Sequence, residues 1–179
     1  TWGLILALVR LKVHSAKAWR SNAIAVVINS ENKILVCKRA LKPYGDGSNP
    51  NVILNNYWQF PQGGLEEDEN TDEGARRELM EETGITNVQF IAEAKHKNYY
   101  TWNNATRKLF YAKYHQYKGP MQTAIFYKFV GFDSEIHLDP EVFSEYAWLA
   151  PGEVLNTLAE ERKPTAEIIL AELAQIQVN

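Results

Sequence analysis

The sequence GGLEEDENTDEGARRELMEETGI, residues 63–85, places nine carboxylates within seventeen positions and includes only two arginines, Arg76 and Arg77. The nine acidic residues are Glu66, Glu67, Asp68, Glu69, Asp72, Glu73, Glu78, Glu81 and Glu82. Carboxylates at this density repel one another, so the segment is costly to fold unless a cation neutralises part of the charge. We therefore expect a cation to neutralise part of the negative charge of this segment.

The second half of the segment predicts an α-helix. Asn70 or Thr71 can cap its first turn with a side-chain oxygen. Gly84 suits the position just after the last turn, where a left-handed backbone conformation ends many helices. The helix is therefore expected to begin at residue 70 or 71 and to stop before Gly84.

On this helix Glu78, Glu81 and Glu82 stand at positions i, i+3 and i+4, so the three carboxylates share one face. Hard divalent cations prefer clusters of oxygen ligands of this kind. Most runs of charge are nevertheless ordinary solvated helix faces. Taken alone, the helix is equally consistent with a metal site and with a solvated acidic surface.

The whole segment fits the box of the Nudix hydrolases, G-x5-E-x7-R-E-U-x-E-E-x-G-U, in which U is aliphatic. The nine defined positions are filled by Gly63, Glu69, Arg77, Glu78, Leu79, Glu81, Glu82, Gly84 and Ile85. The sequence thus resembles that family, which implies an α/β/α sandwich with a mixed β-sheet and the box as a loop–helix–loop at its edge. Residues 20–179 would form this single domain, and Glu69 and Arg77 are expected to pair and brace the box.

The resemblance also implies a chemistry. In the family the box helix binds Mg²⁺ or Mn²⁺, and a pyrophosphate linkage attached to a nucleoside is hydrolysed. Glu78, Glu81 and Glu82 are expected to be the catalytic and metal-binding core, and one of them could serve instead as the general base. Gly63 is expected to offer a main-chain carbonyl to the metal. A diphosphate would be repelled by so many carboxylates, which is consistent with a bridging cation.

Three further segments resemble one branch of the family, the bacterial RNA 5′-pyrophosphohydrolases and the plant-type dinucleoside polyphosphate hydrolases. Residues 58–64, WQFPQGG, match the lead-in to the box of that branch. Residues 133–138, DSEIHL, match a segment whose glutamate is a fourth metal-site carboxylate, which maps onto Glu135. Arg20 matches a phosphate-contacting arginine at the first strand. The resemblance implies a nucleoside polyphosphate or a 5′-phosphorylated RNA end as substrate.

The sequence departs from this branch where its substrate is recognised. Residues 122–125, QTAI, lack the branch's Lys and Trp, and residues 162–166, RKPTA, lack its Tyr. Bases and aromatic residues elsewhere can take over phosphate and nucleobase contacts. The candidates for substrate contact are Arg20, Lys38, Arg39, Tyr99, Tyr100 and Trp102. For the aromatic residues, base stacking and simple packing on a sheet are equally open.

Two alternative functions remain open beside this interpretation. One is a Nudix hydrolase of free nucleotides or of nucleotide sugars of the ADP-ribose type. The other is a Nudix-fold module that binds RNA or nucleotides without catalysis. No box carboxylate is missing, which favours an enzyme.

The composition is that of one globular domain: 179 residues, 45% hydrophobic and 23% charged, with a net charge of −3. The single cysteine, Cys37, excludes an internal disulfide, predicts a small core residue and favours a reducing compartment such as the cytoplasm. No membrane span is expected.

Residues 1–19 are basic and free of acids, which fits either a mitochondrial targeting segment or an extra N-terminal element packed on the domain. The sequence indicates no oligomeric state.

Alternation of apolar and polar residues predicts the remaining elements. A hairpin is expected from the strands 23–28 and 33–39, followed by a long loop over 40–56. Further strands are expected at 57–62, 88–92, 94–102, 108–114, 124–132, 135–138 and 146–149. Helices are expected at 151–158, with Pro151 in the first turn, and at 165–176.

Overall fold

The structure is a computed structural model that describes residues 18–40, 58–101 and 116–176. The predicted strand 108–114, nearly all of the predicted loop, Trp102 and the first seventeen residues lie outside these ranges. Within them, no helix is long and apolar enough to cross a membrane.

The described residues form an eight-stranded mixed sheet. Its strands are β1 (Ala18–Ile28), β2 (Ile34–Arg39), β3 (Trp58–Gln59), β4 (Gln62–Gly64), β5 (Val88–Glu93), β6 (Asn98–Tyr99), β7 (Tyr117–Phe129) and β8 (Phe143–Leu149). The order is β3-β2-β1-β7-β5, and β4, β6 and β8 pair with β1, β7 and β2 respectively. β1 and β7 are parallel, whereas the other strand pairs are antiparallel. The predicted hairpin of β1 and β2 is confirmed.

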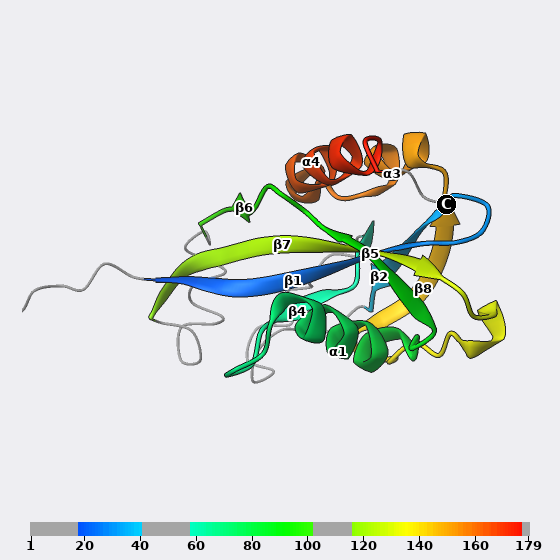
Figure 1. Ribbon diagram of the computed structural model, residues 1–179, viewed down its shortest axis with the longest axis horizontal. Coiled ribbons are helices and arrows are strands. Elements are labelled where there is room, and N and C mark those ends of the chain that lie inside the picture. Colours follow the sequence, from blue (N-terminus) through cyan, green and yellow to red (C-terminus); the bar gives the residue numbers. More distant parts are fainter. Residues whose placement is uncertain (1–17, 41–57, 102–115, 177–179) are drawn as a thin grey trace, which may run out of the picture.

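Helices cover both faces of this sheet (Figure 1). α1 (Thr71–Thr83) lies on one side, and α3 (Pro151–Thr157) and α4 (Lys163–Leu173) lie on the other. The predicted α/β/α sandwich is therefore confirmed. α1 packs against the central strands β1 and β7, so the helix covers a face of the sheet. Among the described strands β4, which leads into the acidic loop, pairs with β1 alone, which is the edge position expected for the box.

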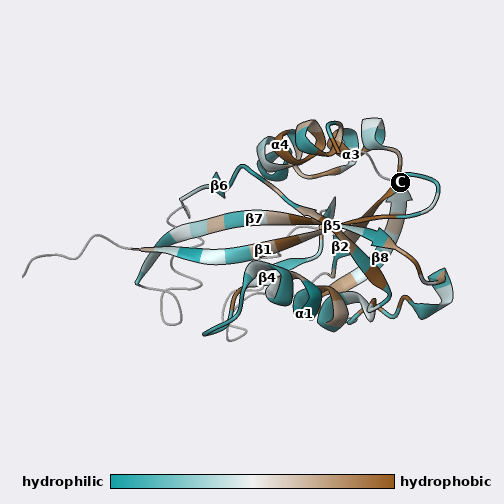
Figure 2. Cartoon of the chain, viewed as in Figure 1, coloured by the Kyte–Doolittle hydropathy of each residue, from teal (hydrophilic) through white to brown (hydrophobic). Residues whose placement is uncertain are grey.

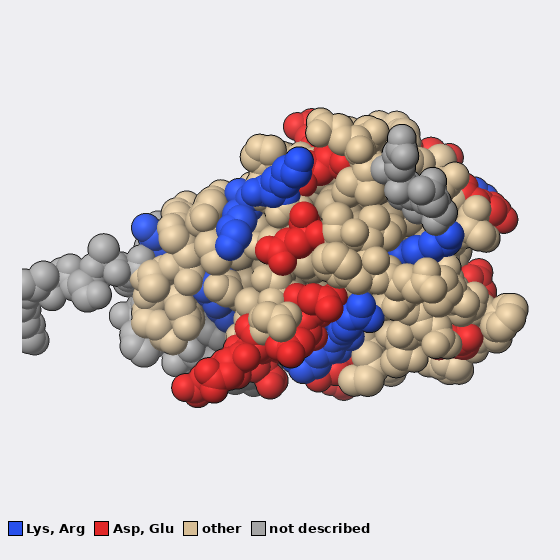
Figure 3. All heavy atoms as spheres, in the orientation of Figure 1, with Lys and Arg blue, Asp and Glu red and all other residues tan. Residues whose placement is uncertain are grey.

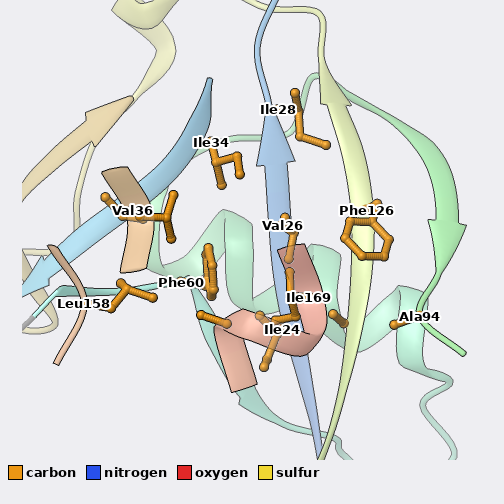
Figure 4. Close-up of a cluster of buried hydrophobic side chains, with 13 residues drawn as sticks. Ile24, Val26, Ile28, Ile34, Val36, Phe60, Ala94, Phe126, Leu158 and Ile169 are labelled. Carbon is orange, nitrogen blue, oxygen red and sulfur yellow. The ribbon is translucent and has the colours of Figure 1, made fainter. Parts of the chain in front are cut away.

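Two apolar layers hold the helices to the sheet. Alternate residues of β1 point to opposite faces: Ile24, Val26 and Ile28 join the layer under α3 and α4, and Ala23, Ala25 and Val27 join the layer under α1. A strand that is buried on both faces reads as a continuous apolar run, which is the pattern of residues 23–28. Figure 4 shows the first layer, whose side chains include Phe60, Phe126, Leu158 and Ile169.

The apolar run covers only part of the long strands. In Figure 2 the ends of β1 and β7 that extend beyond the helices are mostly hydrophilic. These polar halves are strands because β1 and β7 pair in parallel from Ala18 and Tyr117 onward. Hydrogen bonds of the sheet therefore extend β7 seven residues before the predicted start at 124. They also place Ala18 and Trp19, assigned from sequence to the N-terminal extension, in the first strand.

Two other predictions on strands are corrected. Residues 135–138 were expected to form a short strand, but Asp133–Glu135 form a 3-10 turn and the following residues pair with no strand. Their main chain instead binds the end of α1: His137 N donates to Thr83 O at 2.8 Å, and Asp139 N donates to Glu82 O at 3.0 Å. Carbonyls at a helix end need such partners. The predicted strand 94–102 is reduced to Asn98–Tyr99 among the described residues.

The ends of α1 confirm the helix signals of the sequence. Asn70, rather than Thr71, is the N-cap: its side chain accepts from Glu73 N, and the Glu73 side chain accepts from Asn70 N, each at 2.9 Å. Gly84 has a φ of 73°, the left-handed conformation that favours glycine. Local capping therefore sets both ends of the acidic helix.

Candidate active site

Gly63 lies at the point where β4 meets α1. Its main chain pairs with Ala23 of β1, and its Cα faces the helix. A Cβ atom at this position would lie 1.9 Å from Glu78 Cδ and about as close to both carboxylate oxygens. The Glu78 carboxylate thus fills the space of the missing side chain, and only glycine is compatible with this arrangement.

Arg77 joins the acidic loop to the helix. Its Nε donates to Glu69 Oε1 at 2.8 Å and its Nη2 donates to Glu69 Oε2 at 2.9 Å, so the pair is bidentate. Nη2 also donates to Gly64 O at 2.9 Å. The hydrogen bond from Arg77 is the main reason that the pKa of Glu69 is lowered, and the pKa of Arg77 is raised by the same contact. The expected pair of Glu69 and Arg77 is present.

The third nitrogen of Arg77 binds two further carboxylates. Nη1 donates to Glu78 Oε1 at 2.8 Å and to Glu81 Oε2 at 3.2 Å. The Glu78 side chain is only 16% exposed, whereas the Glu81 side chain is 52% exposed. Burial raises the pKa of Glu78 even though Arg77 opposes the shift. One guanidinium therefore offsets much of the acidic charge, and Glu81 keeps contact with solvent.

Glu82 is the most buried of the three helical glutamates, with 7% of its surface exposed. Its Oε2 accepts a 3.0 Å hydrogen bond from Gln62 N. Burial raises the pKa of Glu82 to about 8, and the neighbouring charge of Glu78 adds to the rise. Burial of this kind favours the neutral form of the carboxyl, and a cation beside it would favour the ionised form.

These oxygen donors fit a hard divalent ion. Glu78, Glu82 and the main chain of Gly63 lie together at one end of β4, with Glu81 beside them. Within the residues that the structure describes, however, no three acidic, histidine or cysteine side chains converge as a ready set of ligands. A cation at this position would have to take over the contact that Arg77 now makes with Glu78, and it would bind Glu82 beside the hydrogen bond from Gln62 N.

Glu135 lies apart from these carboxylates. Its Oε2 accepts from Asn87 Nδ2 at 2.5 Å, and its Oε1 accepts from Phe132 N at 3.1 Å. Its main chain passes close to Gly84, at the end of α1. The structure therefore brings the backbone of Glu135 to the acidic helix but turns its carboxylate toward Asn87.

Two of the three predicted phosphate-binding bases flank the glutamates. A Cβ atom at Gly64 would lie 1.9 Å from Arg20 Nη2, so the Arg20 guanidinium covers that glycine. Arg39 lies near Glu82, where its charge opposes the effect of burial on the pKa of that carboxyl. Its Nε is buried and has no hydrogen-bond partner among the described residues. Lys38, in contrast, is tied to Glu145 by a 2.7 Å ion pair.

Of the predicted aromatic contacts, Tyr99 lies on β6 and Tyr100 directly follows it, whereas Trp102 lies outside the described residues. Tyr99 is 47% exposed, and its ring meets Trp19 edge-on with 5.2 Å between centroids. The Tyr100 hydroxyl accepts from Arg162 Nη1 at 3.4 Å. Lys118 Nζ lies 4.6 Å from the centre of the Trp19 ring. This aromatic and basic cluster lies at the end of the sheet that also carries Arg20.

Sequence reasoning missed Trp19 and Gln62. The basic, acid-free composition of residues 1–19 assigns Trp19 to the N-terminal extension, although it immediately precedes the matched Arg20. Gln62 belongs to the lead-in, and its role depends on a main-chain N–H, which carries no sequence signal. Cys37 is buried in the layer under α1, as predicted, and burial raises the pKa of its thiol.

The surface reflects this arrangement. In Figure 3 acidic side chains form a continuous band along the loop before α1 and the helix itself, with basic side chains beside it. Such a surface matches a cation better than a bare phosphate anion.

Comparisons with known proteins identify relatives over most of the chain. The NUDIX domain family matches residues 18–171. Nudix hydrolase 26, chloroplastic, from Arabidopsis thaliana is 30% identical over 165 residues, which are 88% of this chain and 70% of that protein. The RNA pyrophosphohydrolase of Bartonella clarridgeiae is 30% identical over 144 residues, 77% of this chain and 80% of its own length.

Solved structures share the fold. A Caenorhabditis elegans Ap4A hydrolase, solved as a binary complex, superposes with a TM-score of 0.57, covering 87% of this chain and 99% of that one. The MutT protein from Methanosarcina mazei Go1 gives 0.55, covering 90% and 99%. Their sequence identities are 16% and 19%, so these likenesses bear on the fold alone.

Proposed function

The chain belongs to the Nudix family of hydrolases, and on that premise we propose that it cleaves the pyrophosphate linkage of a dinucleoside polyphosphate or of a 5′-triphosphorylated RNA with the help of Mg²⁺ or Mn²⁺. The observation that carries this proposal is the burial of Glu82, which has a pKa near 8, beside Glu78 and the main chain of Gly63. A buried pair of carboxylates is stable in its ionised form only beside a cation.

Each residue has a proposed role. Glu78 and Glu82 would hold the metal together with the Gly63 carbonyl. When bound, the metal polarises the phosphorus and lowers the pKa of an attacking water. Glu81 is the proposed proton acceptor, because its carboxylate is the one of the three that solvent reaches. Glu135 could join these groups only by releasing Asn87.

The flanking bases would meet the polyphosphate. Arg20 lies against Gly64 and Arg39 lies near Glu82, so both could neutralise phosphate oxygens that the metal does not reach. Lys38 is already paired with Glu145 and is the weaker candidate. Tyr99 and Tyr100 are exposed at the same end of the sheet, where a nucleobase could stack on them.

A substrate comparison tests the proposal. The protein would be incubated with Mn²⁺ or Mg²⁺ and, separately, with diadenosine tetraphosphate, 5′-triphosphate RNA and ADP-ribose. We expect cleavage of the first or second substrate and loss of that cleavage in the Glu82→Gln variant. Cleavage of ADP-ribose alone would favour the nucleotide-sugar alternative. Metal binding without cleavage of any of the three would favour a non-catalytic binding module.

The relatives support the RNA end in particular. The matching Bartonella proteins are named RNA pyrophosphohydrolases.

The cellular compartment stays a prediction. The Arabidopsis relative is named chloroplastic, whereas the sequence favours the cytoplasm and leaves a mitochondrial location open.

A further inference from the structure

Gln122 is a buried amide at the centre of the sheet. It lies on β7, is 3% exposed and pairs in register with Asn22 of β1. Its Nε2 donates to Gln62 Oε1 at 2.9 Å and approaches Asn22 Oδ1 at 3.4 Å. An amide buried at this depth must keep its hydrogen bonds, so its orientation is restricted.

The carbonyl end of the same side chain points toward β6 and α4. Gln122 Oε1 lies 3.5 Å from both Asn98 Nδ2 and Thr165 Oγ1. Asn98 and Thr165 are also hydrogen-bonded to each other. Because Asn98 is on β6 and Thr165 is on α4, Gln122 links β6 and the C-terminal helix to β4.

Gln62 carries this link to the acidic site. Its side chain accepts from Gln122, while its main-chain N–H donates to Glu82 Oε2. Gln62 also directly precedes Gly63, whose main chain lies against Glu78. Gln62 is thus hydrogen-bonded to Gln122 through its side chain and to Glu82, the most buried carboxylate of the site, through its main chain.

We propose that Gln122 is a positioning residue for the metal-binding glutamates. By fixing the Gln62 side chain, it fixes the peptide unit that orients Glu82 and the turn into Gly63. This role rests on the proposed function, since it presumes that Glu82 binds the metal. Groups that orient metal ligands typically change metal affinity 10–100-fold when they are removed. A purely structural amide cluster would change stability and leave metal affinity as it is.

The test is Mn²⁺ binding measured by titration calorimetry on the full chain, with the melting temperature recorded for each variant. Gln122→Met keeps the length of the side chain and removes its hydrogen bonds. Gln62→Met removes the same contact by changing its other partner. Gln62 is only half-buried, so this variant still tests the inference if Gln122→Met is poorly folded. We expect both variants to bind Mn²⁺ about tenfold more weakly. The double variant should be no weaker than either single one, because both act through one contact.

Thr165→Val is the matched control. It removes a hydroxyl from the far end of the same cluster, and Asn98 can still donate to Gln122. We expect a lower melting temperature with Mn²⁺ affinity within twofold of the wild type. The inference is overturned if Gln122→Met binds Mn²⁺ as the wild type does, or if Thr165→Val weakens binding equally. A wild-type protein that binds no Mn²⁺ would instead overturn the proposed function, and this inference with it.

Activity gives an independent readout. If Gln122 acts through Glu82, Gln122→Met should lower the rate at limiting Mn²⁺ and regain most of it at saturating Mn²⁺, with the KM for the substrate unchanged. A rate that stays low at saturating Mn²⁺ would contradict a role in metal positioning.

Discussion

The carboxylate of Glu78 occupies the space in which a side chain on Gly63 would lie, since a Cβ atom there would be 1.9 Å from Glu78 Cδ. The two residues are fifteen positions apart in the sequence and come from different elements. Their contact joins the main chain of β4 to the carboxylates of α1, and it makes the backbone of the lead-in part of the site.

Gly63→Ala should therefore displace Glu78. We expect the hydrolytic rate to fall at least 100-fold and Mn²⁺ affinity to fall with it, because the carboxylate must leave its place. Gly152→Ala is the control, since nothing lies within 4 Å of a Cβ atom at that position of α3. It should keep full activity and gain up to about 1 kcal/mol of stability. Equal activity in the two variants would contradict the assigned packing.

Glu82→Gln should have opposite effects on activity and on stability. The pKa of Glu82 rises from 4.5 to about 8 on folding, so the folded protein retains a proton that the unfolded chain loses. Without metal, stability should fall as the pH rises from about 4.5 to 8. The variant lacks this cost, and we expect it to be about 4 kcal/mol more stable than the wild type at pH 8.

Urea unfolding in EDTA at pH 4 and pH 8 measures this difference. The two proteins should be similar at pH 4, where Glu82 is protonated in both states. If the variant and the wild type differ in unfolding free energy by the same amount at both pH values, titration of Glu82 is not the cause of the difference. Activity with Mn²⁺ should be lost in the variant at every pH.

Arg77→Lys should destabilise the loop and the site together. A lysine cannot make the bidentate contact with Glu69 while also reaching Glu78 and Glu81. We expect a loss of about 2–3 kcal/mol in unfolding free energy and reduced activity. Arg76→Lys tests the neighbouring position, where the contact with Asp72 is a half-exposed pair one turn apart. That change should cost about 0.5 kcal/mol and leave activity unchanged.

Arg20→Gln should weaken substrate binding without weakening metal binding. We expect the KM to rise about tenfold, the loss of one charge-assisted phosphate contact. Lys38→Gln is the comparison, because that lysine is paired with Glu145 and should change the KM less than twofold. Steady-state kinetics at saturating Mn²⁺ separate the two variants. A larger effect at Lys38 would reverse the assignment of these bases.

Glu172 should contribute stability that is lost in acid. Burial raises the pKa of this carboxyl, but hydrogen bonds from Lys95 N, His96 N and the His96 ring outweigh it, and the pKa is lowered overall. Its contribution is present above pH 4.5 and is lost as the pH falls through the folded-state pKa. Glu172→Gln should cost about 1 kcal/mol at pH 7, with the difference shrinking below pH 4.5 in urea unfolding. An unchanged difference in acid would contradict this.

Features that depend on neighbours within a few residues could be predicted from the sequence. Asn70 and Gly84 set the ends of α1, and the spacing of Glu78, Glu81 and Glu82 puts them on one turn. The apolar run of residues 23–28 predicted a strand buried on both faces. Capping, helical spacing and alternation are local consequences of backbone geometry, so they need no knowledge of the fold.

The contacts that complete the site depend on which strands pair. Gln122 reaches Gln62 across sixty residues because β7 and β4 both pair with β1. The same pairing sets Arg20 over Gly64, and the end of α1 turns the carboxylate of Glu135 toward Asn87. The sequence by itself therefore determined the acidic helix and predicted the chemistry proposed for it. Only the tertiary structure decided what surrounds it, because sheet register and burial arise from contacts between residues far apart in the chain.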